Sequence, residues 1–215
     1  MDTFDLNCRD CPRLATFLDE VKEQYPDYHA RPVAPFGAAK PRVLIVGLAP
    51  GMHGANATGR PFTGDYAGVL LYKALYQYGF ASAEESVSSD DGLKLIQCKI
   101  TNAVKCLPPE NKPITDEIKQ CNQFLKAELN DLIEGSASST PVVFTLGGIA
   151  HSAVLRAMGL KLKAYPFGHG VAYDLPSGHH LISSYHCSRY NTQTRRLTED
   201  MFMQVLARIR TYVDA

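Results

Sequence analysis

The sequence has no tryptophan, no excess of either charge and no apolar run long enough to cross a membrane. Lysine and arginine (22) equal aspartate and glutamate (22), so any nucleic-acid-binding surface has to be a local one. A membrane helix needs about 18 or more apolar residues, so we expect no membrane partner. The amino terminus, MDTFDLNCRDCPRL, carries acids where a signal peptide needs a basic region and an apolar core. These absences predict a cytoplasmic protein, and the length fits a single domain over residues 1–215.

One stretch, residues 43–65, organises the chain. It opens with the apolar run Val43-Leu44-Ile45-Val46, bounded by proline and glycine, which is typical of a buried strand in a parallel sheet. A long glycine-rich loop follows, GLAPGMHGANATGRPFTGD, and it carries a histidine, an arginine, an aromatic residue and a carboxylate. Open α/β sheets bind their ligands in loops at the carboxyl ends of parallel strands. We therefore interpret this loop as part of a functional site, although a purely structural turn-rich connection is the alternative. It lacks the Gly-Lys-Ser/Thr end of a phosphate-binding P-loop.

Strands and helices alternate along the rest of the chain. Hydrophobic periodicity predicts helices over about 12–25, 64–80, 115–135, 149–158 and 192–212. Further strands are expected within 93–104, at 142–146 and at 179–185. Repeated strand, crossover helix and strand units predict an α/β fold, a three-layer α/β/α sandwich with a central four-stranded parallel sheet.

The chain has six cysteines. Cys8 and Cys11 form a C-x2-C motif, and Cys106 and Cys121 are separated by fourteen residues. In a cytoplasmic chain such cysteines favour a metal or redox role over disulfides. Four thiolates are a usual ligand set for zinc or an iron–sulfur cluster, and the spacing does not choose between them. Buried or redox cysteines without a metal are the alternative.

Polar residues lie near the expected ends of three strands. These are Asp65 beyond the first, Asn102 at the second and His186 at the fourth. Carboxyl ends of parallel strands share one edge of a sheet, so these side chains can converge. Each has a structural alternative, a core histidine for His186 and a turn or cap for Asn102. The segment after His186, CSRYNTQTRRLT, has basic and hydroxyl side chains suited to phosphate contacts, or to a solvated helix start.

Three segments, GLAPGMHGANATGRPFTGD, TNAVKCLPPENKP and SYHCSRYNTQTRRLT, together resemble the uracil-DNA glycosylase superfamily, and most closely its iron–sulfur family 5 (type B). The resemblance extends from Cys8 to the last expected helix. It implies hydrolysis of the N-glycosidic bond of uracil in DNA, within base excision repair. It also implies a structural [4Fe–4S] cluster held by Cys8, Cys11, Cys106 and Cys121.

The resemblance also assigns roles to residues of the site. Phe62 matches the aromatic that stacks on the extruded base, Asn102 the amide that reads the base edge, and His186 the histidine at uracil O2. The remaining expected substrate-binding residues are Gly47, Ala49, Pro50, Gly51, His53 and Asn56. The segment after His186 matches a loop that enters the minor groove. Expected DNA-binding residues are Arg60, Ser188, Arg189, Asn191, Thr192 and Arg195.

The chain departs from the superfamily pattern at several positions. Many members carry Asp or Asn where this chain has Ala49, whose methyl group cannot move a proton. We assign the water-positioning role to Asp65, with His53 and Asn56 as alternatives. Ala57 replaces an expected arginine, Arg195 stands where glycine is common, and Cys187 where proline is frequent.

Three hypotheses therefore follow from the sequence. The first is a monomeric iron–sulfur uracil-DNA glycosylase that also accepts deaminated purines such as hypoxanthine, a breadth that the resemblance implies. The second, based on Ala49 and the missing arginine, is a catalytically weak DNA-damage binding protein with a structural metal cluster. The third, based on the cysteines alone, is a small α/β protein with a structural zinc site.

Overall fold

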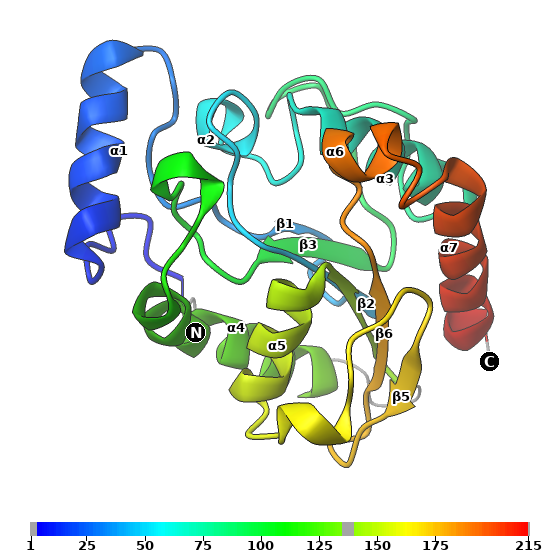
Figure 1. Ribbon diagram of the computed structural model, residues 1–215. Helices are drawn as coiled ribbons and strands as arrows, with labels where there is room; N and C mark the ends of the chain where they lie inside the picture. Colours follow the sequence, from blue (N-terminus) through cyan, green and yellow to red (C-terminus); the bar gives the residue numbers. More distant parts are fainter. Residues whose placement is uncertain (1–3, 135–139, 215) are drawn as a thin grey trace.

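The computed structural model describes residues 4–134 and 140–214 and contains one mixed sheet of six strands, in the order β1-β3-β2-β4-β6-β5 (Figure 1). The four inner strands run parallel: β3 (Cys98–Asn102), β2 (Val43–Gly47), β4 (Val142–Leu146) and β6 (His180–Ser184). The edge strands β1 (Phe36–Gly37) and β5 (Ala172–Asp174) pair antiparallel to their neighbours. The α/β class is confirmed, but the expected four-stranded, wholly parallel sheet is wrong because it omits both edges.

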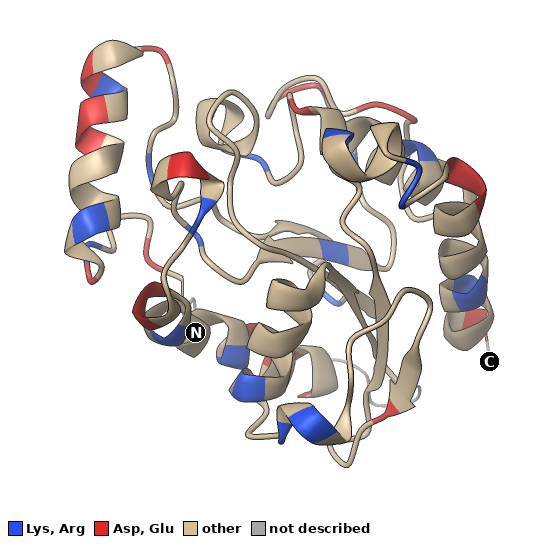
Figure 2. Ribbon diagram, viewed as in Figure 1, with Lys and Arg blue, Asp and Glu red and all other residues tan. Residues whose placement is uncertain are grey.

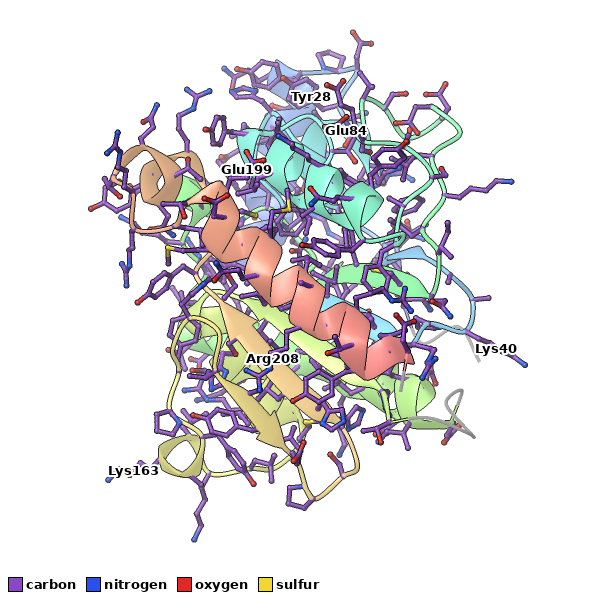
Figure 3. The ribbon with its side chains drawn as sticks, turned by 90° about the vertical axis from the view of Figure 1, so that its right-hand side faces the viewer. Tyr28, Lys40, Glu84, Lys163, Glu199 and Arg208 are labelled. Atoms are coloured by element: carbon purple, nitrogen blue, oxygen red, sulfur yellow. The ribbon has the colours of Figure 1, made fainter. Side chains whose placement is uncertain are left out.

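Helices cover both faces of this sheet (Figure 1). One face packs against α3 (Tyr66–Gln77) and α7 (Glu199–Asp214), the other against α1 (Pro12–Gln24), α4 (Thr115–Glu134) and α5 (Gly148–Ala157). Alternate residues of β2 divide between the two cores, Val43 and Ile45 on one side and Leu44 and Val46 on the other. Figure 3 shows α7 lying across its face of the sheet, from Glu199 toward Arg208. Burial on both faces explains why β2 and β4 are apolar apart from Thr145, whose hydroxyl is paired with Ser183 Oγ at 2.8 Å.

The expected last helix is split in two. α6 (Arg189–Gln193) and α7 (Glu199–Asp214) flank a turn in which Arg195 has a φ of 55°. A residue with a left-handed backbone cannot continue a right-handed helix, so the helix breaks at Arg195. Glycine, which the resemblance leads us to expect at this position, adopts this backbone at little cost, whereas arginine does not. The short helix α2 (Ala55–Thr58) and the 3₁₀ turns η1 (Pro109–Asn111) and η2 (Leu162–Ala164) were not expected from the sequence. The expected stop of α4 at Gly135 lies outside the described residues.

The carboxyl ends of the inner strands meet at one edge of the sheet. The loop with α2 follows β2, the loop with η1 follows β3, and α6 follows β6. Backbone bonds from Ala103 N to Gly47 O (2.9 Å) and from Val104 N to Leu48 O (2.9 Å) extend the β2–β3 pairing into these loops. Among the residues that the structure describes, no helix has the length and apolar character needed to cross a membrane. The fold thus gathers the loops of the three sequence motifs at a single edge.

Candidate active site

A pocket lies at this edge, between the loops that follow β2, β3 and β6. It brings together most of the site residues expected from the sequence. Its lining residues are Leu48, Ala49, Pro50, Gly51, Ala55, Phe62, Asp65, Tyr66, Ala67, Asn102, Asn111, His186, Ser188 and Arg189. Tyr66 and Asn111 were not singled out from the sequence, since tyrosine at a helix start and asparagine in a proline-rich turn carry no distinctive signal.

Phe62 is held in a strained backbone conformation, with a φ of 56°. Its side chain is only 6% exposed, and the hydroxyl of Tyr72 donates to the preceding carbonyl of Pro61 at 2.9 Å. The backbone of Gly68 packs directly against that of Phe62, because a Cβ on Gly68 would lie 1.8 Å from the carbonyl oxygen of Phe62. Non-glycine residues keep a left-handed backbone only where their surroundings impose it, most often at functional sites. The aromatic ring is therefore fixed before any ligand arrives.

Asn102 ends β3, and its amide and the Phe62 ring both lie against Gly47. Gly47 does not line the pocket, but its lack of a side chain makes room for both: a Cβ there would lie 2.4 Å from Asn102 Oδ1 and 2.7 Å from the Phe62 ring. Asn102 is 3% exposed, and its Oδ1 has no hydrogen-bond partner in the described part of the chain. A buried amide left unsatisfied costs free energy unless a ligand completes it. The amide is thus available to the donor and acceptor groups of a ligand.

His186 follows β6 and faces Phe62, with ring centroids 5.9 Å apart and planes at 26°. Burial lowers the pKa of its imidazole to about 4, so the ring is neutral at physiological pH. Asn191 Nδ2 donates to the carbonyl of His186 at 2.8 Å and so ties this residue to α6. Its Nδ1 atom has no partner among the described residues. A neutral imidazole can place an N–H against an oxygen that gains charge.

Asp65 lies at the amino end of α3 and caps it, since Oδ1 accepts a hydrogen bond from Gly68 N at 3.0 Å. Burial raises the pKa of this carboxyl, and hydrogen bonds from the backbone of Gly68 and Ala67 act in the opposite direction. Gly54 allows the carboxylate to pack closely, because a Cβ there would lie 2.6 Å from Oδ2. The cap uses Oδ1, whereas Oδ2 lies beside Gly54 and Gly51, and Asp65 lines the pocket.

Besides Gly47, the expected substrate-binding residues His53 and Asn56 lie outside the pocket. His53 is exposed, and its Nδ1 hydrogen-bonds to the hydroxyl of Tyr28 at 2.9 Å. Asn56 is fully buried in α2, and neither side-chain polar atom has a partner among the described residues. Its carbonyl accepts from Ala30 N at 3.0 Å, which connects α2 to the segment after α1. The assignment of these residues to direct substrate contact is not supported by their placement.

The structure places Arg60 inside the fold and not on the surface that a DNA contact needs. Its side chain is 6% exposed, and Nη1 contacts Asp91 Oδ1 at 2.6 Å and Ser86 Oγ at 3.0 Å. Nη2 donates to Ser89 O at 2.6 Å, and the guanidinium lies 4.3 Å from the centre of the Phe36 ring. Arg60 therefore fastens the loop of residues 84–91 to the fold and is not free to meet a phosphate.

The segment after β6 presents a basic and aromatic surface beside the pocket, and Figure 2 shows its basic residues on α6 and in the next turn. Ser188 caps α6, and the exposed Arg189 guanidinium lies 5.1 Å from the centre of the Tyr66 ring. Tyr190, not singled out from the sequence, is 70% exposed. Thr192 Oγ1 donates to Tyr66 Oη at 3.3 Å. Arg195 is exposed, whereas Asn191 is engaged with His186, so the side chains of this segment divide between outward and anchoring roles.

The four expected cysteine ligands lie around a second cavity, between α1, α4 and the β3–α4 loop. Other walls are largely apolar, and Lys105 N donates to Cys121 Sγ at 3.2 Å. Burial raises the pKa of Cys106 to about 12 and of Cys121 to about 11, and the neighbouring thiols add to the effect at both. Among the described residues, no group of three or more His, Cys, Asp or Glu is arranged to hold a single metal ion.

Comparison with known proteins now identifies the family. A model of the uracil DNA glycosylase superfamily matches residues 34–210. The chain belongs to this superfamily. It is 48% identical over 204 residues to a type-5 uracil-DNA glycosylase of Thermus thermophilus, covering 93% of this chain and 90% of the relative. A type-5 uracil-DNA glycosylase of Mycobacterium tuberculosis is 41% identical over 204 residues, covering 90% and 74%.

These identities place this superfamily member among the type-5 uracil-DNA glycosylases and confirm the resemblance read from the three motifs. A solved structure, the Pedobacter heparinus SMUG2 protein, matches with a TM-score of 0.51 at 14% identity, covering 82% of this chain and 77% of that one. At that identity the match supports the fold alone.

Proposed function

We propose that this protein is a DNA-repair enzyme that hydrolyses the N-glycosidic bond of uracil in DNA and leaves an abasic site. The observation that carries the proposal is the convergence of Phe62, Asp65, Asn102 and His186 on one pocket at the carboxyl edge of the sheet. We assign the activity to the whole of residues 1–215, acting as a monomeric domain on uracil-containing duplex or single-stranded DNA in the cytoplasm. The six free cysteines suit a reducing compartment of this kind.

Base recognition needs the target nucleotide outside the helical stack. Extrusion costs a few kcal/mol and is cheapest at a mismatch such as U·G. The fixed ring of Phe62 can return part of this cost by stacking, which contributes about 1–3 kcal/mol per base. The amide of Asn102, which has an unsatisfied oxygen, pairs with the polar edge of uracil. The pocket thus replaces the contacts that the base loses.

Cleavage of the bond leaves negative charge on uracil and positive charge on the sugar. The neutral imidazole of His186 donates a hydrogen bond to uracil O2, a contact that strengthens as the charge develops. The carboxylate of Asp65 stabilises the cationic sugar and orients the attacking water. Ala49 lines the pocket with a methyl group, which leaves Asp65 as the only carboxylate among the pocket's lining residues.

The surface that follows β6 grips the DNA backbone. Arg189 and Arg195 supply exposed positive charge, and Ser188 supplies a hydroxyl donor. Asn191 holds this surface to His186 through a 2.8 Å hydrogen bond, so backbone contacts and the catalytic histidine move together. The exposed Tyr190 adds an aromatic side chain to the surface that meets the duplex.

The four-cysteine cavity holds a structural [4Fe–4S] cluster. The donor set fits, because four thiols with apolar walls and a backbone N–H donor to Cys121 match the environment of such clusters. When bound, the cluster cross-links the segment before α1 to the β3–α4 loop and α4. Glycosidic hydrolysis itself needs no redox step.

The activity is tested with an end-labelled duplex that carries one U·G pair, incubated with anaerobically purified protein and then treated with alkali. We expect a cut at the uracil together with release of free uracil. Affinity for the uracil-containing duplex without an abasic product would instead favour a catalytically weak DNA-damage binding protein. The same duplex with hypoxanthine tests the proposed breadth toward deaminated purines.

Iron and acid-labile sulfide analysis tests the cluster separately. We expect about four of each per chain, and brown protein. A colourless preparation with stoichiometric zinc would contradict the iron–sulfur assignment and leave the glycosylase proposal untouched.

A further inference from the structure

A second, open hollow adjoins the catalytic pocket on the outer side of Asp65. Its lining residues are Gly64, Asp65, Tyr66, Gly68, Val69, Glu85, Ser86, Val87 and Arg189. Both hollows are lined by Asp65, Tyr66 and Arg189. The start of α3 and the guanidinium of Arg189 therefore separate them. A strand that enters the catalytic pocket can therefore continue into the second hollow.

Several of the side chains that line the hollow and form its floor are apolar and exposed to solvent. Tyr66 is 42% exposed, Val69 61% and Val87 69%. Single exposed apolar residues are ordinary, whereas several gathered in one depression beside a catalytic pocket are typical of a binding site. Nothing in the proposed chemistry uses Val69 or Val87.

The wall that contains Val87 is rigidly held, although it belongs to a loop without helix or strand. Asp91 Oδ2 accepts from Val87 N at 2.8 Å, and Asp91 Oδ1 contacts Arg60 Nη1 at 2.6 Å. Thr63 Oγ1 lies 2.7 Å from Ser86 Oγ and adds a second connection to the motif loop. The buried Arg60 thus holds Val87 beside α3 through Asp91. This structural role differs from the DNA contact expected from the sequence.

The charges around the hollow favour a base over a phosphate inside it. Asp65 and Glu85 are both on its lining and repel a phosphate, while the apolar floor favours a flat ring. Arg189 lies on the boundary between the two hollows, with its guanidinium 5.1 Å from the centre of the Tyr66 ring. The boundary is therefore the place suited to a phosphate.

We propose that this hollow receives the base of the nucleotide adjacent to the target uracil in the same strand. The proposal rests on the proposed function, since it presumes a strand bent into the catalytic pocket. Extrusion of uracil leaves its neighbour without a stacking partner on one side. That base packs on Tyr66, Val69 and Val87, while Arg189 contacts the phosphate that links it to the target.

The test removes the neighbouring base and the apolar floor separately and together. Three duplexes carry one U·G pair: one is intact, one has an abasic tetrahydrofuran residue 5′ to the uracil, and one has it 3′. The variants are Val69→Ser/Val87→Ser and a matched control, Ile96→Ser/Ile133→Ser, in which the exposed isoleucines lie outside both hollows. Single-turnover kinetics give the half-saturating protein concentration and the maximal rate for each pair.

We expect the half-saturating concentration of wild type and control to rise about tenfold when the base on one side is removed. This rise corresponds to about 1.4 kcal/mol of binding free energy. Val69→Ser/Val87→Ser should already be about tenfold weaker on the intact duplex and lose nothing more, with its maximal rate unchanged. Equal losses in wild type and variant, or no loss on either side, would overturn the proposal. No abasic product from wild type on any duplex would instead refute the proposed function.

Discussion

The rings of Phe62 and His186 lie face to face across the pocket, 5.9 Å between centroids, although the two residues come from loops on opposite sides of β4. Phe62 is fixed by its left-handed backbone and His186 by the hydrogen bond from Asn191. Each contact is present in the protein without substrate, so the site is organised before the base arrives. Such preorganisation is the main source of electrostatic catalysis in enclosed sites.

Substitution of Asp65 separates its charge from its capping role. Asp65→Asn keeps a side chain that can cap α3, whereas Asp65→Ala also loses about 1 kcal/mol of stability. We expect both variants to lose about 100-fold or more in single-turnover excision at U·G while retaining duplex affinity. The proposed role needs the carboxylate form of Asp65, and burial raises the pKa of this group. As the pH is lowered, the wild-type rate should therefore begin to fall at a higher pH than it would with a carboxyl of ordinary pKa. Wild-type excision by Asp65→Asn would move the role to another group.

The half-buried His186 should make stability depend on pH. Its pKa is about 4 in the folded protein and about 6.5 in the unfolded chain. Between these values only the unfolded chain gains the proton, so the free energy of unfolding falls as the pH drops from 6.5 toward 4. Urea unfolding at pH 7.5 and 4.5 should show a loss in wild type that exceeds the loss in His186→Asn by about 2–3 kcal/mol. Equal losses would place the imidazole in contact with solvent.

Gly47 should be intolerant of any side chain. In Gly47→Ala the new Cβ meets Asn102 Oδ1 at 2.4 Å and the Phe62 ring at 2.7 Å, so both groups that hold the base must move. We expect excision to fall at least tenfold with a loss of about 1–3 kcal/mol of stability. Gly148→Ala is the matched control, since a Cβ at the start of α5 meets nothing closer than 3.4 Å. Similar kinetics for both variants would contradict the close fit.

A buried ion pair connects the cysteine cavity to the base-reading strand. Lys105, 1% exposed, contacts Glu128 Oε1 of α4 at 2.7 Å and also bonds Thr101 next to Asn102. Lys105→Met should destabilise the protein by about 3–5 kcal/mol because it leaves Glu128 charged and buried. Lys105→Met/Glu128→Leu should recover most of this loss, as measured by denaturant unfolding. Additive losses would mean that the two charges do not interact.

Arg189 and Arg60 should differ in their effect on DNA binding. Arg189→Ala should lower the slope of log affinity against log salt by about 1, because an exposed phosphate contact is lost. Arg60→Gln should leave the slope unchanged and instead reduce stability by roughly 1–3 kcal/mol, since the hydrogen bonds of its guanidinium to Asp91, Ser86 and Ser89 are lost. A reduced salt dependence of DNA affinity in Arg60→Gln would instead show that Arg60 contacts DNA.

The central strands were predictable because burial on both faces favours apolar runs, as in residues 43–46. The edge strands β1 and β5 were missed, since two and three residues are too short to show a period. The break between α6 and α7 was missed because the apolar stripe of the last helix is clear, whereas the left-handed turn at Arg195 leaves no signal in hydrophobicity.

The convergence of Asp65, Asn102 and His186 follows from topology, because residues after parallel strands reach one edge. The burial of Arg60 did not follow, since its partner Asp91 lies 31 positions along the chain in a loop without a pattern. From the sequence, Arg60, Arg189 and Arg195 were all predicted to contact DNA. Only the tertiary structure distinguishes an arginine that holds a loop from one that meets DNA.

The most direct test of the central claim is a crystal structure of Asp65→Asn bound to a duplex with one U·G pair. We expect the uracil to lie outside the helix on the Phe62 ring, with the Asn102 amide at its polar edge and His186 at O2. A uracil that remains stacked in the duplex, or that occupies any other cavity of the protein, would contradict the assignment of this pocket as the active site.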